Sequence, residues 1–258
     1  MRLRIFLLAY FAAVSAPLAF TPPSSAKKPT LAERLHESYM SIKTLSCRIR
    51  KTERKGKAER RWLSRVYYAK GGKIHVENIA PFKRRIISDG NTLYYHFKGA
   101  KKGYACPIKE LKEPFLSAYR NVPATPVEHL EKLVALKETR LKRDRTFPLR
   151  RGYISDNLFV TLSCDKKERL SQIDFFKTPA MTNLLARYVY GSYVKTGGVW
   201  IALSHKGEIY FDNGTKVTET RRIDSLTVDE PIPGNIFNAS LFFRNIEFTG
   251  ELKDLDNQ

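Results

Sequence analysis

The chain has 258 residues, of which 42% are hydrophobic, and carries a formal net charge of +20 at pH 7. This length suits one large or two small domains with an ample hydrophobic core, and we expect one domain. The charge favours an anionic partner or surface. The basic residues are spread along the chain and form no recognised nucleic-acid-binding motif, so we expect no nucleic-acid partner.

The first 26 residues have the pattern of a secretory signal peptide. Arg2 and Arg4 precede an apolar run, which ends in a proline-rich stretch of small residues. The run is shorter than the roughly 20 apolar residues that a membrane-spanning helix needs. We predict cleavage after Ala26 or, as an alternative, after Ala19. The mature chain, residues 27–258, would then be a soluble periplasmic protein with a net charge of +18.

The three cysteines, Cys47, Cys106 and Cys164, are an odd number for an exported chain. The simplest outcome in an oxidising compartment is one disulfide and one remaining thiol, and the sequence leaves the pairing open. Their wide spacing matches no zinc or redox motif, so we expect no metal.

The mature chain begins with a predicted helix and continues with strands. Thr30 and Glu33 have the spacing of a capping box, and apolar residues at helical intervals predict an amphipathic helix over residues 31–43. Apolar and polar side chains alternate over residues 61–68 and 73–77, which predicts half-buried strands. Residues 84–97 predict two further strands joined by a tight turn at Asp89-Gly90.

Helical signals interrupt the strands over residues 108–136. Thr125 as N-cap, Pro126 at the first helical position and Glu128 as the capping glutamate predict a helix in a helix-loop-helix insertion against the sheet. Strand patterns resume at residue 158, and Asn213-Gly214 marks another hairpin. About ten strands without βαβ alternation predict a mainly β (α+β) fold, a curved, incompletely closed antiparallel β-barrel covered by short helices.

Apolar and aromatic side chains share the face that we assign to the inside of this barrel. A barrel interior that is large and aromatic would either bind an acyl chain or be filled by a helix. Aromatic side chains on the inner face of a sheet also form ordinary hydrophobic core. The candidate lining residues are Trp62, Val66, Tyr68, Ile74, Val76, Leu93, Tyr95, Phe97, Phe175, Tyr188 and Tyr190.

Three features follow one another along the chain: a strand through Lys70, then Pro81, and then the hairpin Ser88-Asp89-Gly90 that continues to Tyr95. This order resembles that of the LolA-like proteins, the periplasmic carriers of outer-membrane lipoproteins. The segments 198–201 and 223–242 are similar to the closing strands and final short helix of longer lipoprotein-sorting relatives. The resemblance covers about half of the mature chain.

The resemblance implies an open barrel whose apolar cavity binds the acyl chains of a lipoprotein or lipid without covalent chemistry or cofactor. It also implies inner- and outer-membrane partner proteins that load and unload the carrier. Family members latch a lid with an arginine at a strand end, and Lys70 stands at the matching position, followed by Gly71 in place of proline. Because lysine lacks arginine's planar fork, a lid latch at Lys70 would be weaker or absent.

The sequence carries no recognisable catalytic motif. It has no nucleophile elbow and no phosphate-binding glycine loop, and none of its histidines has metal-binding spacing. We place His75 and His96 on the solvent face of their strands. The histidines are His36, His75, His96, His129 and His205. We therefore expect no enzyme, and an exported hydrolase built from groups on separate strands is the least favoured alternative.

Two basic stretches, residues 48–61 and 137–151, would either contact an anionic membrane surface or form solvated loops. Together these observations favour a soluble periplasmic carrier or chaperone that binds acyl chains. The second hypothesis is an envelope sensor or scaffold of the same fold that binds without shuttling.

Overall fold

The computed structural model describes residues 28–111, 121–142, 145–155 and 158–249. The expected signal peptide, residues 1–26, lies outside the described residues. Of the helices that are described, none combines the length and the apolar character needed to cross a bilayer.

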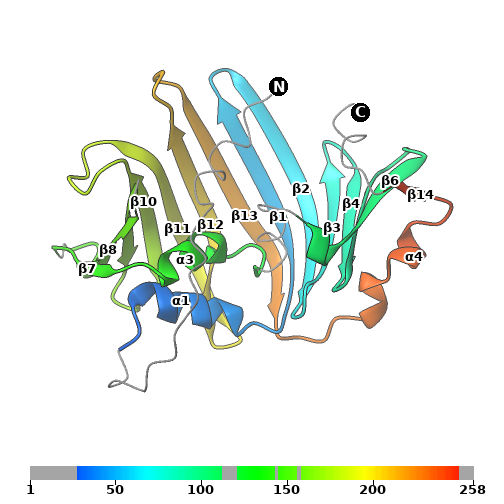
Figure 1. Cartoon of the computed structure of the whole chain (residues 1–258), viewed down its shortest axis with the longest axis horizontal. Helices are drawn as coiled ribbons and strands as arrows, with labels where there is room; N and C mark the ends of the chain where they lie inside the picture. Colours follow the sequence, from blue (N-terminus) through cyan, green and yellow to red (C-terminus); the bar gives the residue numbers. More distant parts are fainter. Residues whose placement is uncertain (1–27, 112–120, 143–144, 156–157, 250–258) are drawn as a thin grey trace.

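Fourteen strands of the described residues form one curved sheet (Figure 1), in the order β14-β6-β5-β4-β3-β2-β1-β13-β12-β11-β10-β9-β8-β7. Neighbours are antiparallel except β14 and β6, and the end strands β14 and β7 do not pair, so the sheet is not closed. The predicted fold class is confirmed. The strands are β1 (Thr44–Lys55), β2 (Ala58–Ala69), β3 (Lys73–Ala80), β4 (Arg84–Asp89), β5 (Thr92–Phe97), β6 (Lys102–Pro107), β7 (Glu138–Arg140), β8 (Leu149–Ser155), β9 (Leu158–Cys164), β10 (Leu170–Phe176), β11 (Leu184–Thr196), β12 (Val199–Tyr210), β13 (Lys216–Val228) and β14 (Glu247–Thr249).

Two helices, α1 (Leu31–Met40) and α3 (Val127–Val134), pack together across one face of the sheet (Figure 1). The predicted capping box at the start of α1 is confirmed, because Thr30 Oγ1 accepts a hydrogen bond from the Glu33 amide and the Glu33 carboxylate accepts one from the Thr30 amide. The helix ends at Met40, three residues before the predicted end.

The predicted start of α3 is wrong by one residue. Pro126 is the N-cap, and the Thr125 hydroxyl donates to the Val122 carbonyl, so it does not cap the helix. The Pro126 carbonyl instead accepts the first helical hydrogen bond, from Leu130. Because the Thr125 hydroxyl is hydrogen-bonded to the Val122 carbonyl just before the helix, it does not cap α3, and the helix begins one residue later.

The main hydrophobic core lies between these helices and the sheet. Leu31 of α1 and Leu130 of α3 belong to the same buried cluster as Ile173 of β10 and Ile201 of β12. Each of the four is at most 1% exposed. Fully burying such a side chain contributes about 1.5–3 kcal/mol, so this cluster holds the helices on the sheet.

The opposite face of β3, β4 and β5 is covered by the C-terminal segment, which contains η3 (Gly234–Phe237) and α4 (Ala239–Phe242). There His75 is only 3% exposed, its Nδ1 lies 2.8 Å from the Ile236 carbonyl oxygen, and its ring contacts Phe242. His96 is partly buried beside Phe243. The predicted solvent exposure of both histidines is wrong, because strand alternation does not reveal a cover supplied by a distant segment.

The turn at Asp89-Gly90 forms as predicted. The Asp89 carboxylate accepts hydrogen bonds from the amides of Asn91 and Thr92, at 2.8 and 2.9 Å, and Gly90 has a φ of +103°. Such a positive φ favours glycine. Asp89 is therefore a turn residue.

The expected disulfide does not form, and Cys47, Cys106 and Cys164 are all free and buried. Cys47 lies on β1, with four strands between it and Cys106 on β6 and another four between it and Cys164 on β9. Neighbouring strands are about 4.8 Å apart, whereas bonded cysteines need Cα atoms within about 7 Å. The strand order thus separates all three thiols.

Candidate functional site: a groove on the concave face

The eleven predicted lining residues share one face of the sheet. Residues that lie directly opposite in neighbouring strands point to the same side, so the pairing register places them. The rows across the strands are Tyr190–His205–Arg221–Lys51–Trp62, then Ser64–Asn78–Arg84–Phe97, then Val66–Val76–Ile86–Tyr95, then Tyr68–Ile74–Ser88–Leu93, with Tyr188 and Phe175 flanking the first row. This shared face is the one that α1 and α3 cross.

The structure divides these residues between a filled half and an open half of the face. Phe175, Tyr188 and Tyr190 pack against the core beneath the helices, and the His129 ring of α3 lies 5.6 Å from Phe175 and 4.6 Å from Tyr188. Tyr68 is also in this core.

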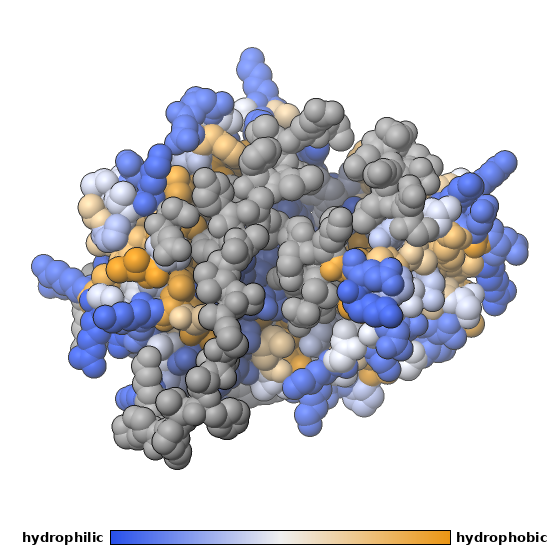
Figure 2. All heavy atoms as spheres, viewed as in Figure 1, coloured by the Kyte–Doolittle hydropathy of each residue, from blue (hydrophilic) through white to orange (hydrophobic). Residues whose placement is uncertain are grey.

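In the open half, Trp62, Val66 and Val76 line a groove of about 280 Å³. Val66 is only 3% exposed and also belongs to the main core, so it forms the floor of the groove. Its other lining residues are Ile49, Lys51, Ser64, Asn78, Arg84 and Arg221. The remaining predicted residues lie beside or below it: Ile74 is buried, Leu93 and Tyr95 form a small cluster with Tyr104 and Cys106, and Phe97 packs edge-on against Tyr95 at 5.2 Å. Figure 2 shows hydrophilic side chains around the rim of this face and hydrophobic residues to the left and right of its centre.

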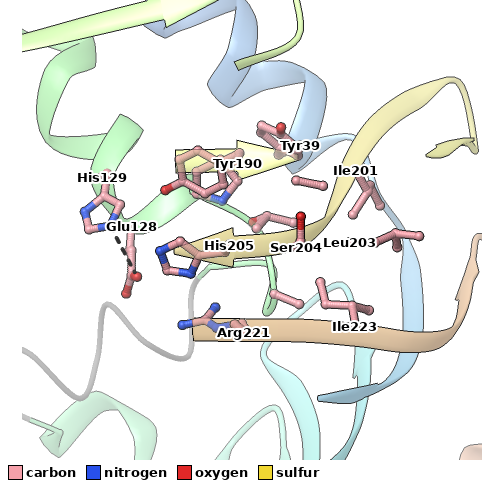
Figure 3. A pocket seen from close by; sticks show the side chains of 14 residues that line it. Tyr39, Glu128, His129, Tyr190, Ile201, Leu203, Ser204, His205, Arg221 and Ile223 are labelled. Atoms are coloured by element: carbon pink, nitrogen blue, oxygen red, sulfur yellow. Dashed lines mark ion pairs between the residues drawn. The ribbon is translucent and has the colours of Figure 1, made fainter. Parts of the chain in front are cut away.

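Beneath α3 almost no space remains (Figure 3). The cavity among Tyr39, His129, Tyr190 and His205 has about 20 Å³, which is room for about one water molecule. The His205 ring stacks on Tyr190 with their centroids 5.1 Å apart. This half of the interior is occupied by the protein's own side chains.

Burial also keeps the histidines of this filled half uncharged. It lowers the pKa of His205 to about 3, assisted by nearby Arg221, and it lowers the pKa of His129. The buried Nε2 of His205 has no hydrogen-bond partner among the described residues. Both rings therefore act as aromatic packing groups at neutral pH.

The open groove carries three cations that the sequence analysis did not place there. Lys51 and Arg221 both pair with Glu219, the latter at 3.2 Å. Burial raises the pKa of Glu219, but these two cations outweigh it, and the net effect is a pKa below the usual range. Arg84 Nη1 donates to the Tyr95 hydroxyl at 3.2 Å. Strand parity alone puts Lys51 on the same face as Cys47 and Ile49, and that signal could have found it.

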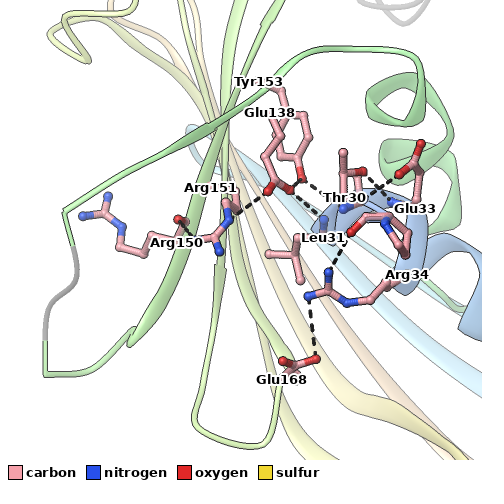
Figure 4. Close-up of polar contacts among 11 residues, drawn as sticks. Thr30, Leu31, Glu33, Arg34, Glu138, Arg150, Arg151, Tyr153 and Glu168 are labelled. Atoms are coloured by element: carbon pink, nitrogen blue, oxygen red, sulfur yellow. Dashed lines mark hydrogen bonds and ion pairs between the residues drawn. The ribbon is translucent and has the colours of Figure 1, made fainter. Parts of the chain in front are cut away.

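A carboxylate anchors α1 to the far edge of the sheet (Figure 4). Glu138 of β7 accepts hydrogen bonds from the Leu31 amide at 2.6 Å, the Tyr153 hydroxyl at 2.7 Å and Arg151 Nε at 2.9 Å. Burial raises the pKa of Glu138, but these donors outweigh it and hold the pKa below the usual range. The first turn of α1 is thus fixed to β7 and β8.

A larger, strongly basic groove of about 560 Å³ lies beside α4. Arg65 and Arg85 pair with Glu77, the one acidic residue among its described lining residues, at 3.3 and 2.6 Å. Lys83 and Lys98 also line it and form no ion pair within the described chain. No cluster of three or more potential metal ligands occurs among the described residues.

Comparison with known proteins supplies the fold relationship. No protein-family model matches the sequence, and no curated protein matches it. Solved structures do match. The chain has a LolA-like fold.

Three of these structures show the extent of the likeness. A LolA superfamily protein from Nitrosomonas europaea is 12% identical with a TM-score of 0.50, and the match covers 80% of this chain and 96% of that one. A putative outer membrane lipoprotein-sorting protein domain from Vibrio parahaemolyticus is 13% identical with a TM-score of 0.51, covering 81% and 98%. A DUF1329 family protein from Desulfovibrio piger is 12% identical with a TM-score of 0.53, covering 82% and 95%.

Within the LolA-like fold, Lys70 directly follows β2 and is exposed. Its amide donates to the Lys43 carbonyl at 2.8 Å, which places it beside the connection from α1 to β1. Its ammonium forms no ion pair with a described residue. The residue expected to latch a lid therefore lies near the end of α1.

Proposed function

We propose that this protein is a periplasmic carrier that binds acyl chains of a lipoprotein or lipid in its concave groove and moves them across the envelope. The observation that carries the proposal is the open groove over Trp62, Val66 and Val76 in a chain with a LolA-like fold. Its volume of about 280 Å³ lies just below the range of about 300–1,000 Å³ for ligand pockets.

Apolar burial supplies the binding free energy in this proposal. Each methylene group removed from water contributes about 0.8 kcal/mol, so ten buried methylenes contribute roughly 8 kcal/mol before the costs of association. Those costs leave an affinity that permits release to a partner. Binding and release require no covalent step, and we propose no catalytic activity.

The proposed route begins with export directed by residues 1–26 and continues with loading and unloading by inner- and outer-membrane partner proteins. Lys70 is the proposed lid latch because it lies beside the chain that leaves α1. We also propose contact with anionic membrane through residues 48–61. Within that stretch Arg54 and Arg61 pair with Glu59, so part of its charge is already neutralised.

The test is binding of a fluorescent sixteen-carbon fatty acid to the mature protein and to Trp62→Asp. We expect the variant to lose binding, because an acyl chain that covers the new carboxylate would remove its hydration, which costs free energy. Trp200→Asp is the matched control, since Trp200 is on β12 one residue before inward-facing Ile201 and thus faces the other way. Equal binding by folded wild type and Trp62→Asp would contradict the proposal.

A sensor or scaffold of the same fold is the second candidate. It is favoured by the filled half of the interior, where Tyr188 and Tyr190 pack beneath α3. A scaffold would bind its envelope partner with no acyl chain in the groove. Failure of the fatty acid to bind wild type, together with capture of an envelope component by the folded protein, would favour this candidate over the carrier.

A further inference from the structure

The open groove differs from a purely apolar lipid site because its lining is positively charged. Lys51, Arg84 and Arg221 line it, and no acidic residue of the described part of the chain does. Glu219 neutralises one unit of charge between Lys51 and Arg221. Arg84 has no carboxylate partner among the described residues, and its hydrogen bonds go to neutral acceptors, the Tyr95 hydroxyl and, once the Asn78 amide is turned, the Asn78 side-chain oxygen. The groove therefore keeps an excess of two positive charges.

These cations occupy one end of the groove and the apolar residues occupy the other. Arg221, Lys51 and Trp62 form one row across β13, β1 and β2, and Arg84 belongs to the next row. The following row contains Val66 and Val76. Polarity thus changes from charged to apolar over two rows, which is four residues along β2 from Trp62 to Val66.

The Trp62 ring lies where the lining changes from charged to apolar, a position that suits both the head group and the acyl chain of an amphiphile. Lys51 Nζ lies 5.7 Å from the centroid of the Trp62 ring. Trp62 also borders the apolar floor of the groove. A ring in this position contacts the first methylenes of a chain while the cation beside it contacts the head group.

We infer that the groove selects an anionic amphiphile, with its carboxylate or phosphate head group between Lys51, Arg84 and Arg221 and its acyl chain over Val66 and Val76. Covering these cations with a neutral ligand removes water without supplying a partner, which is costly. An anionic head group restores charge-assisted hydrogen bonds. The inference rests on the proposed function and adds the chemical class of the ligand.

The test compares decanol, decanoate and decyl phosphate, each below the concentration at which it forms micelles. Trp200→Phe serves as the background, because the chain has two tryptophans and Trp62 then reports binding by its fluorescence. We expect decanoate or decyl phosphate to bind about tenfold more tightly than decanol, the factor that one charge-assisted hydrogen bond supplies. Whichever anion binds more tightly identifies the head group as carboxylate or phosphate.

The outcomes separate this inference from the proposed function. If none of the three ligands binds, the carrier proposal fails. If decanol binds as tightly as both anions, the carrier proposal stands and the anionic selectivity is wrong. A preference that persists undiminished at 1 M salt would also contradict the charge-based account, since exposed electrostatic interactions are screened there.

A matched pair of double variants assigns the preference to this groove. Lys51→Met with Arg84→Gln removes two groove cations, while Arg221 remains paired with Glu219. Lys83→Met with Lys98→Gln removes two cations that line the neighbouring groove beside α4 and not this one.

We expect the first variant to reduce the preference for the anion over decanol about tenfold and the second to preserve it. Equal reductions in both would mean that net charge, and not the groove, selects the ligand. Circular dichroism checks the fold of each variant. If the first double variant is unfolded, Lys51→Met alone replaces it, because Lys51 lines this groove only, whereas Arg84 also lines the groove beside α4. An unchanged preference in that variant would overturn the inference.

Discussion

The two halves of the concave face differ in what covers them. Beneath α1 and α3, Tyr188, Tyr190 and His205 are packed so closely that about 20 Å³ remains. Among the described residues, the part of the same face around Trp62, Ser64 and Val76 is not covered by these helices and holds a groove of about 280 Å³. The same alternation of aromatic and aliphatic residues thus produces core beneath the helices and part of a groove lining beside them.

The largest expected effect comes from the filled half. Leu130→Ala truncates a fully buried side chain of α3, and we expect a loss of about 2–5 kcal/mol in the free energy of unfolding. Val76→Ala in the partly exposed groove should cost about 1 kcal/mol or less. Urea denaturation of both variants measures the contrast. Equal losses would show that the halves do not differ in packing.

The anchor of α1 sharpens the comparison through its pH dependence. Glu138→Gln should cost about 1–3 kcal/mol at pH 7, because a neutral amide cannot accept all three hydrogen bonds that Glu138 accepts. The pKa of Glu138 is lowered in the folded state, so its contribution is present above the unfolded carboxyl's pKa of about 4.3. It disappears as pH falls through the folded pKa.

Urea denaturation of wild type and Glu138→Gln at pH 7 and at acid pH measures this difference. We expect the two proteins to converge in acid. A gap of constant size would contradict the assignment of Glu138 as the ionised anchor.

A smaller effect is expected from His205. Because burial lowers its pKa to about 3, the unfolded chain binds a proton that the folded chain does not as pH falls below about 6.5. As the pH falls from about 6.5 toward 3, wild-type stability should therefore fall by up to about 1.4 kcal/mol per pH unit from this group. His205→Phe replaces a ring whose Nε2 has no partner, and it should lessen this loss. Identical pH profiles for both proteins would exclude His205 as a source.

The smallest expected effect concerns Lys70. Lys70→Arg supplies a planar fork beside the segment that follows α1 and should slow ligand release by a few fold if that position latches a lid. Stopped-flow displacement of the fluorescent fatty acid gives the rate. Identical rates in the two proteins would mean that no latch operates there.

Much of this arrangement is predictable from the sequence because it depends on local signals. The capping box at Thr30, the turn at Asp89 and the alternation around Val66 and Val76 each act within a few residues, and the structure contains all three features. The shared face of the lining residues also follows from strand parity. The open, mainly β fold is correct for the same reason.

What the sequence did not predict depends on contacts between distant segments. His75 is buried because residues near Ile236 cover it. The cations of the groove converge from strands far apart in the chain, Lys51 on β1 and Arg221 on β13, which only the sheet order makes neighbours. Alternation assigns a side chain to a face, and the strand order decides what that face meets.

Mass spectrometry of ligands extracted from the denatured mature protein, purified from cell envelopes, tests the central claim most directly. The account predicts an acyl-bearing molecule, with an anionic head group, released from wild type and from Trp200→Asp and absent from folded Trp62→Asp. Recovery of no acyl-bearing molecule from folded wild type, or equal recovery from all three proteins, would contradict it.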